Sequence, residues 1–576
     1  MSEQHYNQEL SRLRDLASEF SRAHPALAPM LSGPSKDPDV ERILEGCAFL
    51  TGLLRQKLED DFPEVVQGLM RLVFPHYLRP IPSTTILAFT PQPFLQETLT
   101  VPAKTTIASI PVDGISCPFQ TCYPVEVHPL RLQDAQLHRQ PGKPLELVLR
   151  LELMNLPLSS WKPKKLRLHL AGAFPEASAL YQALLGEVTD IRLSTDGQSP
   201  LRLGPEALRA VGWDIQEGLF PYPPFAYPGY RAIQEYFVLP EKFLFLELGQ
   251  LDTWKLRGPG SKFQIAFCFR GADLPLQAVR ADMFQLFATP AINLFDHEAD
   301  PIALDHKRTE YRIQPSAGDT SQYQVFSVEK VIGTSPGSAN RREYVPFESF
   351  VPGAEGAPVY TVVPRISPVH GIAESWLTLS YPPQGGLPAT ETLSVEIRCT
   401  NAALPEKLQI GDISRPTNDS PTFCEFHNIR KPSAPIQPPL GKNLLWRLLN
   451  HLTVNLLSLA DKEALKKLLA LYLFPDTSDH AQLVANERRI EGILDMKATV
   501  CNRLVRGINM QGLEVFLELH PKHFAGKGDL YLFGCVLDFF LGTYASINCF
   551  IELTVKDAVS GETKTWPARI GQRPLL

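Results

Sequence analysis

The chain has 576 residues, of which 44% are hydrophobic and 20% are charged, and its 62 acids and 56 bases give a formal net charge of −6. This length exceeds what one hydrophobic core usually fills, so we expect three to four domains. The near balance of charge, without a basic block, argues against a nucleic-acid-binding surface. The nine cysteines are odd in number and scattered, which indicates buried thiols in a reducing compartment and argues against a disulfide framework.

No segment of the sequence has the pattern of a secretory leader or a membrane anchor. The first residues, MSEQHYNQELSRLRDL, contain no apolar core of the kind that a signal peptide needs. The most apolar run, residues 530–542, is shorter than the ~18 residues of a membrane-spanning helix and carries Asp538. We therefore expect a soluble, cytoplasmic protein without direct membrane insertion.

Residues 1–83 are predicted to form an N-terminal helical segment that serves in assembly. In its first part, apolar residues recur at steps of four and three, which places them on one face of a helix. A second helix is predicted to begin at Pro38, since Asp37 can cap it and acids follow in its first turn. The two apolar faces are the predicted partner interface, formed by Tyr6, Leu10, Leu13, Ala17 and Phe20 on the first helix and by Val40, Ile43, Cys47, Leu50 and Leu54 on the second.

The stretch RLVFPHYLRPIPS, residues 71–83, follows a third predicted helix and contains three prolines within eight residues. Since proline disfavours a helical conformation at the residue before it, we expect the helix to end here, and the strand-like run TTILAF follows directly. We interpret the stretch as a rigid elbow between the helical segment and a β-rich region. The alternative is a catalytic cluster of His76, Tyr77 and Arg79, which we disfavour because no acid or nucleophile lies beside them in the sequence.

The middle of the chain is predicted to form two β-rich domains, residues 84–290 and 291–430. Apolar and alternating runs such as LELVLRLEL and KFQIAFCFR are typical of strands, and turn signals separate them. The chain contains 52 prolines, which favours strand edges, turns and long ordered loops in this region. The stretch KPSAPIQPPLGK, residues 431–442, contains four prolines and is predicted to be a linker.

Residues 443–576 are predicted to form a C-terminal α+β domain. A leucine-dense helix at residues 443–459 comes first, and a second helix ends at Leu473. A β-α-β-β unit is then indicated by a strand at residues 513–519, a buried helix at 529–545, a strand at 547–555 and, after a turn at Gly561, the run KTWPARI. The predicted fold class is therefore α+β and multidomain, with an N-terminal helical bundle segment, β-rich middle domains and this C-terminal α+β domain.

The sequence contains none of the common motifs for nucleotide binding, serine hydrolysis or zinc proteolysis. The cluster worth weighing is FDHEADPIALDHKRTEY, residues 295–311, whose acids and histidines could bind a divalent metal. We favour a solvated loop there, and we expect no catalytic residue, no cofactor and no metal. A secreted β-sandwich adhesin is disfavoured by the missing leader and the odd cysteine count. The alternative function is a β-rich hydrolase that works through the acids and histidines of residues 296–306, namely Asp296, His297, Glu298, Asp300, Asp305 and His306.

Several blocks of the sequence resemble one known family. They include DPDVERILEGCAFLTGLLRQKLEDDFPEV, FPHYLRPIPS, YRAIQEYFVLPEKFLFLEL and WRLLNHLTVNLLSL, and the ending FFLGTYASINCF with WPARIGQRPLL. Together they resemble the TssF family, the baseplate subunits of the bacterial type VI secretion system, from the first helix to the last residue. The chain departs from the family pattern at Cys47 and Cys549 and in the charged loop before Pro301, which bears on local packing there.

The resemblance implies a structural role without catalysis. TssF is similar to the wedge proteins of contractile phage-tail baseplates, and two copies are expected to join one TssG. The implied partners are a second TssF copy, TssG, TssK, TssE and the spike hub VgrG. Six such wedges would surround the hub and prime sheath polymerisation. The chain is therefore expected in the cytoplasm, docked at the inner membrane through the baseplate.

Overall fold

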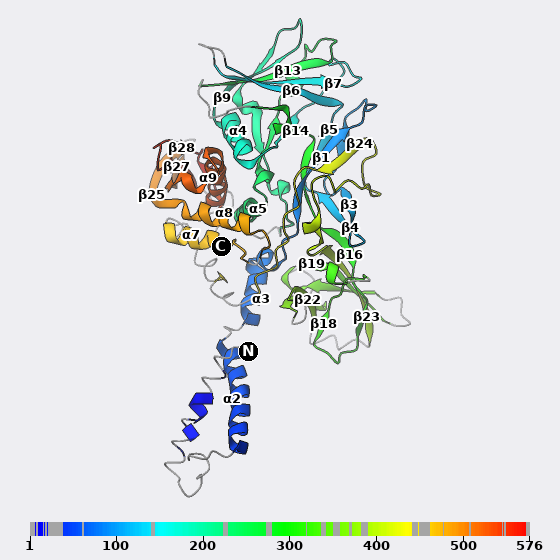
Figure 1. The fold of residues 1–576 in the computed structure, drawn as a ribbon, viewed down its shortest axis with the longest axis vertical. Coiled ribbons are helices and arrows are strands. Elements are labelled where there is room, and N and C mark those ends of the chain that lie inside the picture. The colour runs from blue at the N-terminus through cyan, green and yellow to red at the C-terminus, as the bar shows by residue number, and fades with distance from the viewer. Residues whose placement is uncertain are drawn as a thin grey trace. The chain divides into compact units, whose positions relative to one another are not determined.

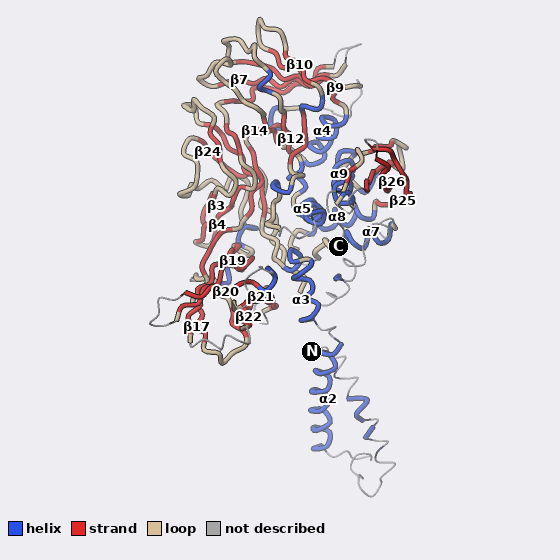
Figure 2. Tube along the Cα trace, turned by 180° about the vertical axis from the view of Figure 1, so that it is seen from behind, coloured by secondary structure: helices blue, strands red, loops and turns tan. Residues whose placement is uncertain are grey.

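The chain divides into two compact units. The first consists of Met1–Leu78 with Leu440–His451, and the second consists of Arg79–Pro439 with Leu452–Leu576. Figure 1 shows the helices and strands, coloured by residue number. All strands among the described residues belong to the second unit, as the colouring of Figure 2 shows. The computed structural model describes the chain except for residues 1–5, 7–9, 15, 18–19, 21–37, 60–62, 140–143, 223–227, 272–278, 318–319, 336–340, 350–356, 368–370, 382–389, 441–446, 449–460, 476, 506–507, 544, 546–548 and 572–576.

The first unit is helical in its described part. The helix α2, Pro38–Glu59, begins at the predicted proline, so this predicted start is confirmed. It is followed by α3, Pro63–Val73, and by a short 3-10 helix, Pro75–Leu78. In the first predicted helix, the described residues 10–14 are helical.

Helical structure gives way to strand structure within residues 71–83. The helix α3 ends at Val73, and the first strand, β1, begins at Thr84. Pro80 and Pro82 fall between them, where no helical or sheet hydrogen bond needs their missing N–H groups. The predicted change of structure at this stretch is confirmed.

The second unit begins with a five-stranded sheet in the order β24-β1-β15-β4-β3. All of its neighbouring strands are antiparallel. The strand β1 is buried except at Thr90, because it has β15 on one side and β24 on the other. The sheet joins segments that lie far apart in the sequence, namely β1 (Thr84–Pro91), β3 (Thr106–Val112), β4 (Ile115–Thr121), β15 (Ala288–Ile292) and β24 (Cys424–Asn428).

This sheet crosses the positions at which the sequence suggests domain boundaries. The strand β15 spans residue 290, and β24 lies directly before residue 430, yet both pair with β1. The domain limits therefore stay a prediction. Local composition does not show which distant strands share a sheet.

Residues 431–439 differ from the free linker that their prolines predict. The backbone N–H of Ser433 donates to the carbonyl oxygen of Thr84 at 2.8 Å. Ile436 and Ile81 form an antiparallel bridge with N···O distances of 2.8 and 2.9 Å. The segment therefore follows the chain at the start of β1, because its serine and isoleucine supply the N–H groups that its prolines lack.

Two further sheets follow in the same unit. One has the order β10-β9-β13-β7-β6 and the other has the order β11-β12-β8-β14, while β2 and β5 form a separate pair. The helices are α4, Phe174–Gly186, and α5, Pro228–Val238, and α5 is buried from Gly229 onward. The strands are β2 (Leu99–Val101), β5 (Val125–Val127), β6 (Leu130–His138), β7 (Glu146–Leu153), β8 (Leu166–Leu170), β9 (Val188–Ser194), β10 (Leu201–Leu203), β11 (Leu208–Val211), β12 (Phe245–Leu248), β13 (Lys262–Phe269) and β14 (Phe284–Leu286).

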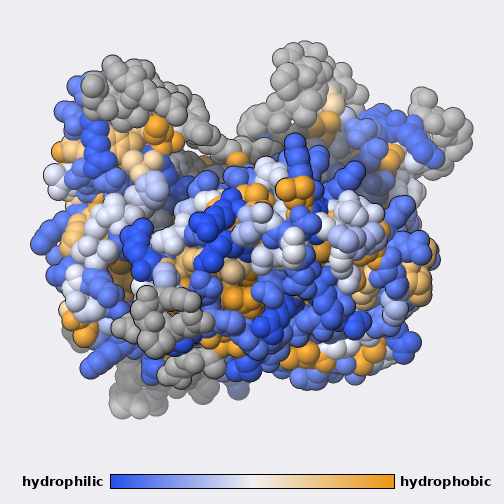
Figure 3. Space-filling model, turned by 90° about the horizontal axis from the view of Figure 1, so that it is seen from above, coloured by the Kyte–Doolittle hydropathy of each residue, from blue (hydrophilic) through white to orange (hydrophobic). Residues whose placement is uncertain are grey.

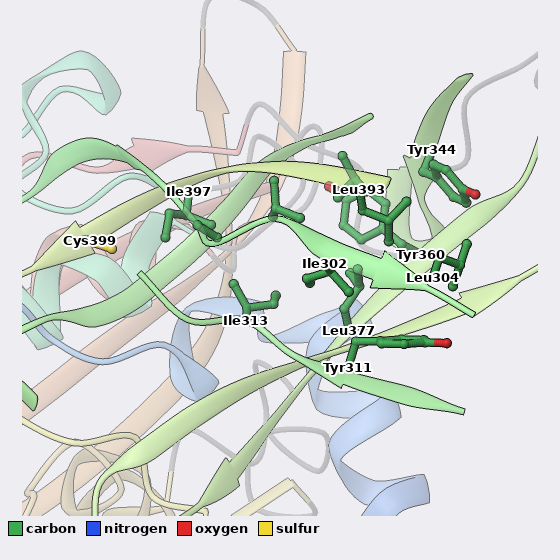
Figure 4. Packing of buried hydrophobic residues seen from close by; sticks show 13 residues of the cluster. Ile302, Leu304, Tyr311, Ile313, Tyr344, Tyr360, Leu377, Leu393, Ile397 and Cys399 are labelled. Carbon is green, nitrogen blue, oxygen red and sulfur yellow. The ribbon is translucent and has the colours of Figure 1, made fainter. Parts of the chain in front are cut away.

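A larger sheet in the order β16-β23-β19-β20-β21-β22-β18 surrounds a core of its own, with β17 also beside β23. Buried side chains from several of its strands, among them Ile302, Leu377 and Ile397, gather in one hydrophobic cluster (Figure 4). The pair β20–β21 is parallel. The strands are β16 (Phe295–Glu298), β17 (Ile302–Leu304), β18 (Glu310–Arg312), β19 (Gln324–Thr334), β20 (Arg341–Pro346), β21 (Val359–Ile366), β22 (Ala373–Ser380) and β23 (Glu391–Thr400).

The C-terminal part contains a sheet in the order β25-β26-β27-β28, with β29 beside β27. The parallel strands β26 and β27 are connected through α9, so the predicted β-α-β-β unit is confirmed. The sequence did not predict β25, and most of the helix predicted at residues 443–459 lies outside the described residues. The elements are α7 (Lys462–Ala470), α8 (His480–Glu491), β25 (Ile493–Val505), β26 (Ile508–Leu519), α9 (Lys527–Gly542), β27 (Cys549–Asp557), β28 (Thr563–Thr565) and β29 (Arg569–Ile570).

The helix α8 docks on the end of α5 through side-chain amides. Gln482 and Asn486 both donate to the backbone carbonyl of Phe237, at 2.7 and 3.0 Å. Phe237 lies in the last turn of α5, where a helix leaves its carbonyl groups without partners of its own. The C-terminal elements therefore share packing and hydrogen bonds with the β-rich middle of the second unit.

Candidate assembly interface

The helix α2 presents apolar side chains to solvent. Ile43 is 66% exposed and Leu50 is 61% exposed, and Phe49 and Cys47 are exposed as well. Ala48, in contrast, is fully buried. A helix usually turns its apolar side toward a core, so the exposure of these apolar side chains on α2 is unusual.

The described part of the first segment packs beside α2. Arg14 forms an ion pair with Glu41 of α2, and Leu10 is buried with 7% of its surface exposed. Phe20, further along, is 49% exposed. The remaining predicted interface residues of this segment are half-buried, namely Tyr6, Leu13 and Ala17.

The structure therefore separates the predicted interface residues into two groups. Leu10 and its half-buried neighbours contribute to packing inside the first unit. The side chains of Val40 and Leu54 lie outside the described residues. The other predicted residues form what we call the outer apolar face, which consists of Phe20, Ile43, Cys47 and Leu50.

The interface prediction omitted further exposed apolar side chains of the first unit. Leu16 and Phe49 flank the outer apolar face in sequence, and α3 exposes Leu69 and Val73 while it buries Met70. Leu69 and Val73 are four residues apart and therefore share one helix face. This spacing was the sequence signal that could have identified them.

The three polar residues of the stretch 71–83 make separate contacts. His76 is buried, with its ring edge-on to that of Phe74 and the ring centroids 6.4 Å apart. Tyr77 accepts a hydrogen bond from Arg447, whose guanidinium also lies 5.9 Å from the centroid of the tyrosine ring. The guanidinium carbon of Arg79 lies 5.4 Å from the centroid of the Phe326 ring. Burial lowers the pKa of Arg79. These contacts support a structural role for the stretch.

The charged residues of 295–311 are spread over strands and turns. Asp296 pairs with Arg398 at 3.5 Å, and His297 stacks on a tyrosine with the ring centroids 5.4 Å apart. Asp305 accepts the backbone N–H two residues further on at 3.1 Å, which holds the pKa of this carboxyl below its usual value. In the part of the chain that the structure describes, no three histidine, cysteine, aspartate or glutamate side chains come together as a metal site.

The most deeply buried charged side chains belong to α5 and to the turn after it. Glu235 accepts the backbone N–H of Leu219 at 2.6 Å and pairs with Lys242. Lys242 also donates to the carbonyl oxygen of Gly212 at 2.5 Å, and burial lowers its pKa. These bonds hold the loop between Gly212 and Leu219 against α5. The group therefore serves the fold of the second unit.

Burial also makes several thiols poor nucleophiles. It raises the pKa of Cys117 to about 11, and it raises the pKa values of Cys399 and Cys424 to about 12. Because the thiolate is the reactive form, these three side chains behave as small apolar residues near neutral pH.

Figure 3 shows one face of the molecule coloured by hydropathy. There, hydrophobic residues form small patches that hydrophilic residues separate. Among the described helices, none combines the length and the apolar composition that crossing a membrane requires.

Residues 2–573 match the family model described as Type VI secretion system, TssF. The chain is 30% identical over 627 aligned positions to the type VI secretion system component TssF1 of Pseudomonas aeruginosa, with 100% of this chain and 99% of that protein covered. Its structure is similar to a chain of the type VI secretion system TssK-TssF-TssG baseplate subcomplex, with a TM-score of 0.78 and 30% identity over 93% of this chain and 99% of that one. It is also similar to a chain of the baseplate complex from the type VI secretion system, with a TM-score of 0.64 and 26% identity over 100% of both chains. The protein therefore belongs to the TssF family of the type VI secretion system.

Proposed function

We propose that this protein is a structural wedge subunit of a type VI secretion baseplate. It joins TssG, TssK and TssE around the spike hub VgrG and primes sheath polymerisation. The observation that carries the proposal is the similarity of nearly the whole chain to a chain of a TssK-TssF-TssG baseplate subcomplex. The protein acts in the cytoplasm and docks at the inner membrane through the assembled baseplate.

The first unit is the part of the protein that makes the central contact. Its outer apolar face, formed by Phe20, Ile43, Cys47 and Leu50, is the kind of surface that a neighbouring helix covers in a bundle. A helical segment of this length has little core of its own, so association supplies the burial that it lacks. The occupants are helices of TssG and of a second TssF copy.

The test is a pull-down of TssG with the double variant Ile43→Ser, Leu50→Ser. Each truncated side chain contributes roughly 1–3 kcal/mol if it lies at the centre of the interface, so binding should fall strongly. The matched control is Ile410→Ser, because Ile410 is equally exposed but lies in the second unit. Thermal melting of each variant alone should match that of the parent.

Leu10→Ala provides the contrasting case. Leu10 is buried inside the first unit, so its truncation should lower the melting temperature of that unit. If Ile43→Ser, Leu50→Ser binds TssG as well as the control does, the outer apolar face is not the contact and this part of the proposal fails.

The proposed role does not involve catalysis. Asp296, His297 and Asp305 bond to separate neighbours, and no three metal-binding side chains come together among the described residues. The double variant Asp300→Asn, His306→Asn should therefore assemble with TssG and TssK as the parent does. An intact fold with a lost catalytic activity would instead favour the hydrolase alternative.

A further inference from the structure

An open groove crosses the solvent-exposed face of the sheet β10-β9-β13-β7-β6. Its larger part is a hollow of about 770 Å³, lined by Arg131 and Gln133 of β6, by Glu152 of β7 and by residues 154–157 and 259–261. A smaller hollow of about 380 Å³ shares Gln133 and Glu152 with it and continues over β13. The two hollows therefore adjoin and form one groove across the strands, which we call the basic groove.

Arg131 carries a charge in the basic groove that the described part of the protein does not use. It is exposed and lies opposite Glu152 in the pairing of β6 with β7, yet its side chain makes no ion pair or hydrogen bond among the described residues. Glu152 bonds instead to Gln133 at 2.7 Å and lies 3.8 Å from Lys262. The guanidinium of Arg131 is therefore available to a carboxylate from another molecule.

Two loops that contribute to the basic groove, residues 155–164 and 250–261, add further positive charge. Asp252 is the only acid in these two segments of the sequence. Their exposed lysines have no ion pair within the described ranges, namely Lys162, Lys164 and Lys255. The rim of the basic groove therefore has an excess of positive charge, which attracts an acidic partner.

A buried arginine holds the two loops together. Arg257 is 6% exposed, and it donates to the carbonyl oxygens of Trp254 at 2.5 Å and of Leu251 at 2.8 Å. Its guanidinium carbon lies 5.9 Å from the centroid of the Trp161 ring, which belongs to the other loop. The backbone N–H of Leu251 also donates to the carbonyl oxygen of Lys164 at 3.2 Å. The backbone that carries the lysines is therefore fixed before a partner binds, which lowers the entropic cost of association.

An exposed aromatic pair adjoins the basic groove. Pro93 lines the larger hollow, and its carbonyl oxygen accepts a hydrogen bond from the side-chain amide of Asn155. The next residue, Phe94, is 61% exposed and meets Phe423 edge-on, with the ring centroids 6.2 Å apart. Phe423 is itself 49% exposed. Aromatic side chains are frequent anchors of protein interfaces, so this pair can receive an apolar side chain of a partner.

We propose that the basic groove binds an acidic, extended segment of a partner protein. Carboxylates of this segment pair with Arg131 and with the lysines of the two loops, and an apolar side chain of the segment packs on Phe94 and Phe423. The side-chain amides of Gln133 and Gln264, which line the two hollows, bond to its backbone. An acidic chain fits better than an anionic membrane, because a flat bilayer does not fill a concave groove. The inference does not depend on the outer apolar face.

The test is fluorescence anisotropy of the full chain with a fluorescein-labelled dodecapeptide that repeats the unit Glu-Gly-Glu-Phe. The protein should bind this peptide roughly tenfold more tightly than the same peptide with glutamine in place of each glutamate. Binding of the glutamate peptide should weaken between about 50 mM and about 500 mM NaCl, because salt screens the exposed charges.

Variants of the groove separate the charged contacts from the apolar one. Arg131→Gln and Lys255→Gln each remove a charge without introducing an opposite one, so each should weaken binding roughly two- to fivefold and reduce its salt dependence. Phe94→Ser should weaken binding roughly tenfold and leave the salt dependence unchanged, because it removes an apolar contact. Lys522→Gln is the matched control, since Lys522 is exposed and has no ion pair in the described part of the chain but lies in the C-terminal elements. Circular dichroism confirms that each variant is folded.

The proposal is overturned if the glutamine peptide binds as tightly as the glutamate peptide, or if Lys522→Gln weakens binding as much as Arg131→Gln does. Sedimentation with phosphatidylglycerol vesicles tests the membrane as the occupant. Vesicle binding that Arg131→Gln abolishes, without binding of the peptide, would assign the groove to a lipid surface and overturn the proposal as well. The double variant Ile43→Ser, Leu50→Ser should bind the peptide as the parent does. A failure of this inference therefore leaves the proposed wedge function untouched.

Discussion

The hydroxyl of Tyr236 donates a 2.7 Å hydrogen bond to the carboxylate of Asp529, which lies 293 residues further along the chain. The same carboxylate accepts the Nε–H of Arg489 at 3.1 Å and the backbone N–H of Ala525 at 3.0 Å. Three helices, α5, α8 and α9, therefore meet at one buried acid. This contact makes the C-terminal elements and the middle of the second unit depend on each other for stability.

Asp529→Ala should lower the free energy of unfolding by roughly 3–5 kcal/mol, because it leaves the buried guanidinium of Arg489 without its carboxylate. Tyr236→Phe removes one hydrogen bond and should have a smaller effect, about 1–2 kcal/mol. Urea unfolding followed by circular dichroism measures both. The control is Lys527→Ala, which removes an ion pair between two partly exposed side chains and should change stability little. Equal effects of Asp529→Ala and Lys527→Ala would contradict this account.

Stability should fall as the pH drops from 6.5 to 4, and His128 should contribute to the fall. His128 is buried, its Nδ1 lies 2.9 Å from Oγ1 of Thr98, and its ring meets Trp161 edge-on at 5.6 Å. Burial lowers its pKa to about 4. The unfolded chain therefore takes up a proton below pH 6.5 that the folded chain does not bind until pH 4, which removes up to about 3 kcal/mol of stability over this window.

The measurement is the urea midpoint between pH 4 and pH 7.5 for the parent and for His128→Gln. The glutamine side chain can still bond to Thr98 but does not titrate, so the midpoint of the variant should depend less on pH. A residual dependence is expected from His169, whose burial lowers its pKa to about 3. An unchanged slope in His128→Gln would show that His128 is not responsible.

Brief proteolysis should spare residues 431–439 in the free protein. The segment is rich in proline, but its backbone is held against the start of β1 by Ser433 and Ile436. Ser433→Pro removes the N–H that bonds to Thr84 and should make the segment susceptible to subtilisin. Mass spectrometry of the fragments shows the sites of cleavage. Cleavage within 431–439 in the parent, at the rate seen in the variant, would mean that the segment is an open linker after all.

Cys47 should report on occupation of the outer apolar face. It is exposed on α2, whereas Cys117, Cys399 and Cys424 are buried thiols with raised pKa values. Iodoacetamide should therefore label Cys47 in the native protein and leave the other three intact until the chain unfolds. In a complex with TssG, Cys47 should become protected. Equal labelling of Cys47 in the free and bound protein would place the contact elsewhere.

Local sequence patterns predicted those features that local chemistry determines. The start of α2 at Pro38 follows from a capping acid and a proline, and the order of β26, α9 and β27 follows from runs of apolar residues. The strand β25 was missed because Asp495, Lys497 and Arg503 interrupt its apolar pattern. What made it a strand is its pairing with β26, which no local pattern shows.

The same limit applies to the candidate interface. Spacing alone placed Leu10 and Phe20 on one helix face, but it does not tell which of them faces the unit's own interior. The structure buries Leu10 and exposes Phe20. The sheet around β1 could not be predicted from the sequence either. Its neighbours are strands near residues 290 and 426, which lie far outside the short stretches in which a periodic pattern can be recognised.

The arrangement of β1 has a consequence for how the protein is made. Both neighbours of β1 come late in the chain: β15 begins at Ala288 and β24 begins at Cys424. At ribosomal rates of roughly 5–20 residues per second, a nascent β1 waits on the order of tens of seconds before both of its edges are covered. During this time the apolar run ILAF within β1 can pair with a wrong strand, and closure over so long a loop is slow. Production of this protein should therefore depend on chaperones that shield the nascent chain until β24 has left the ribosome.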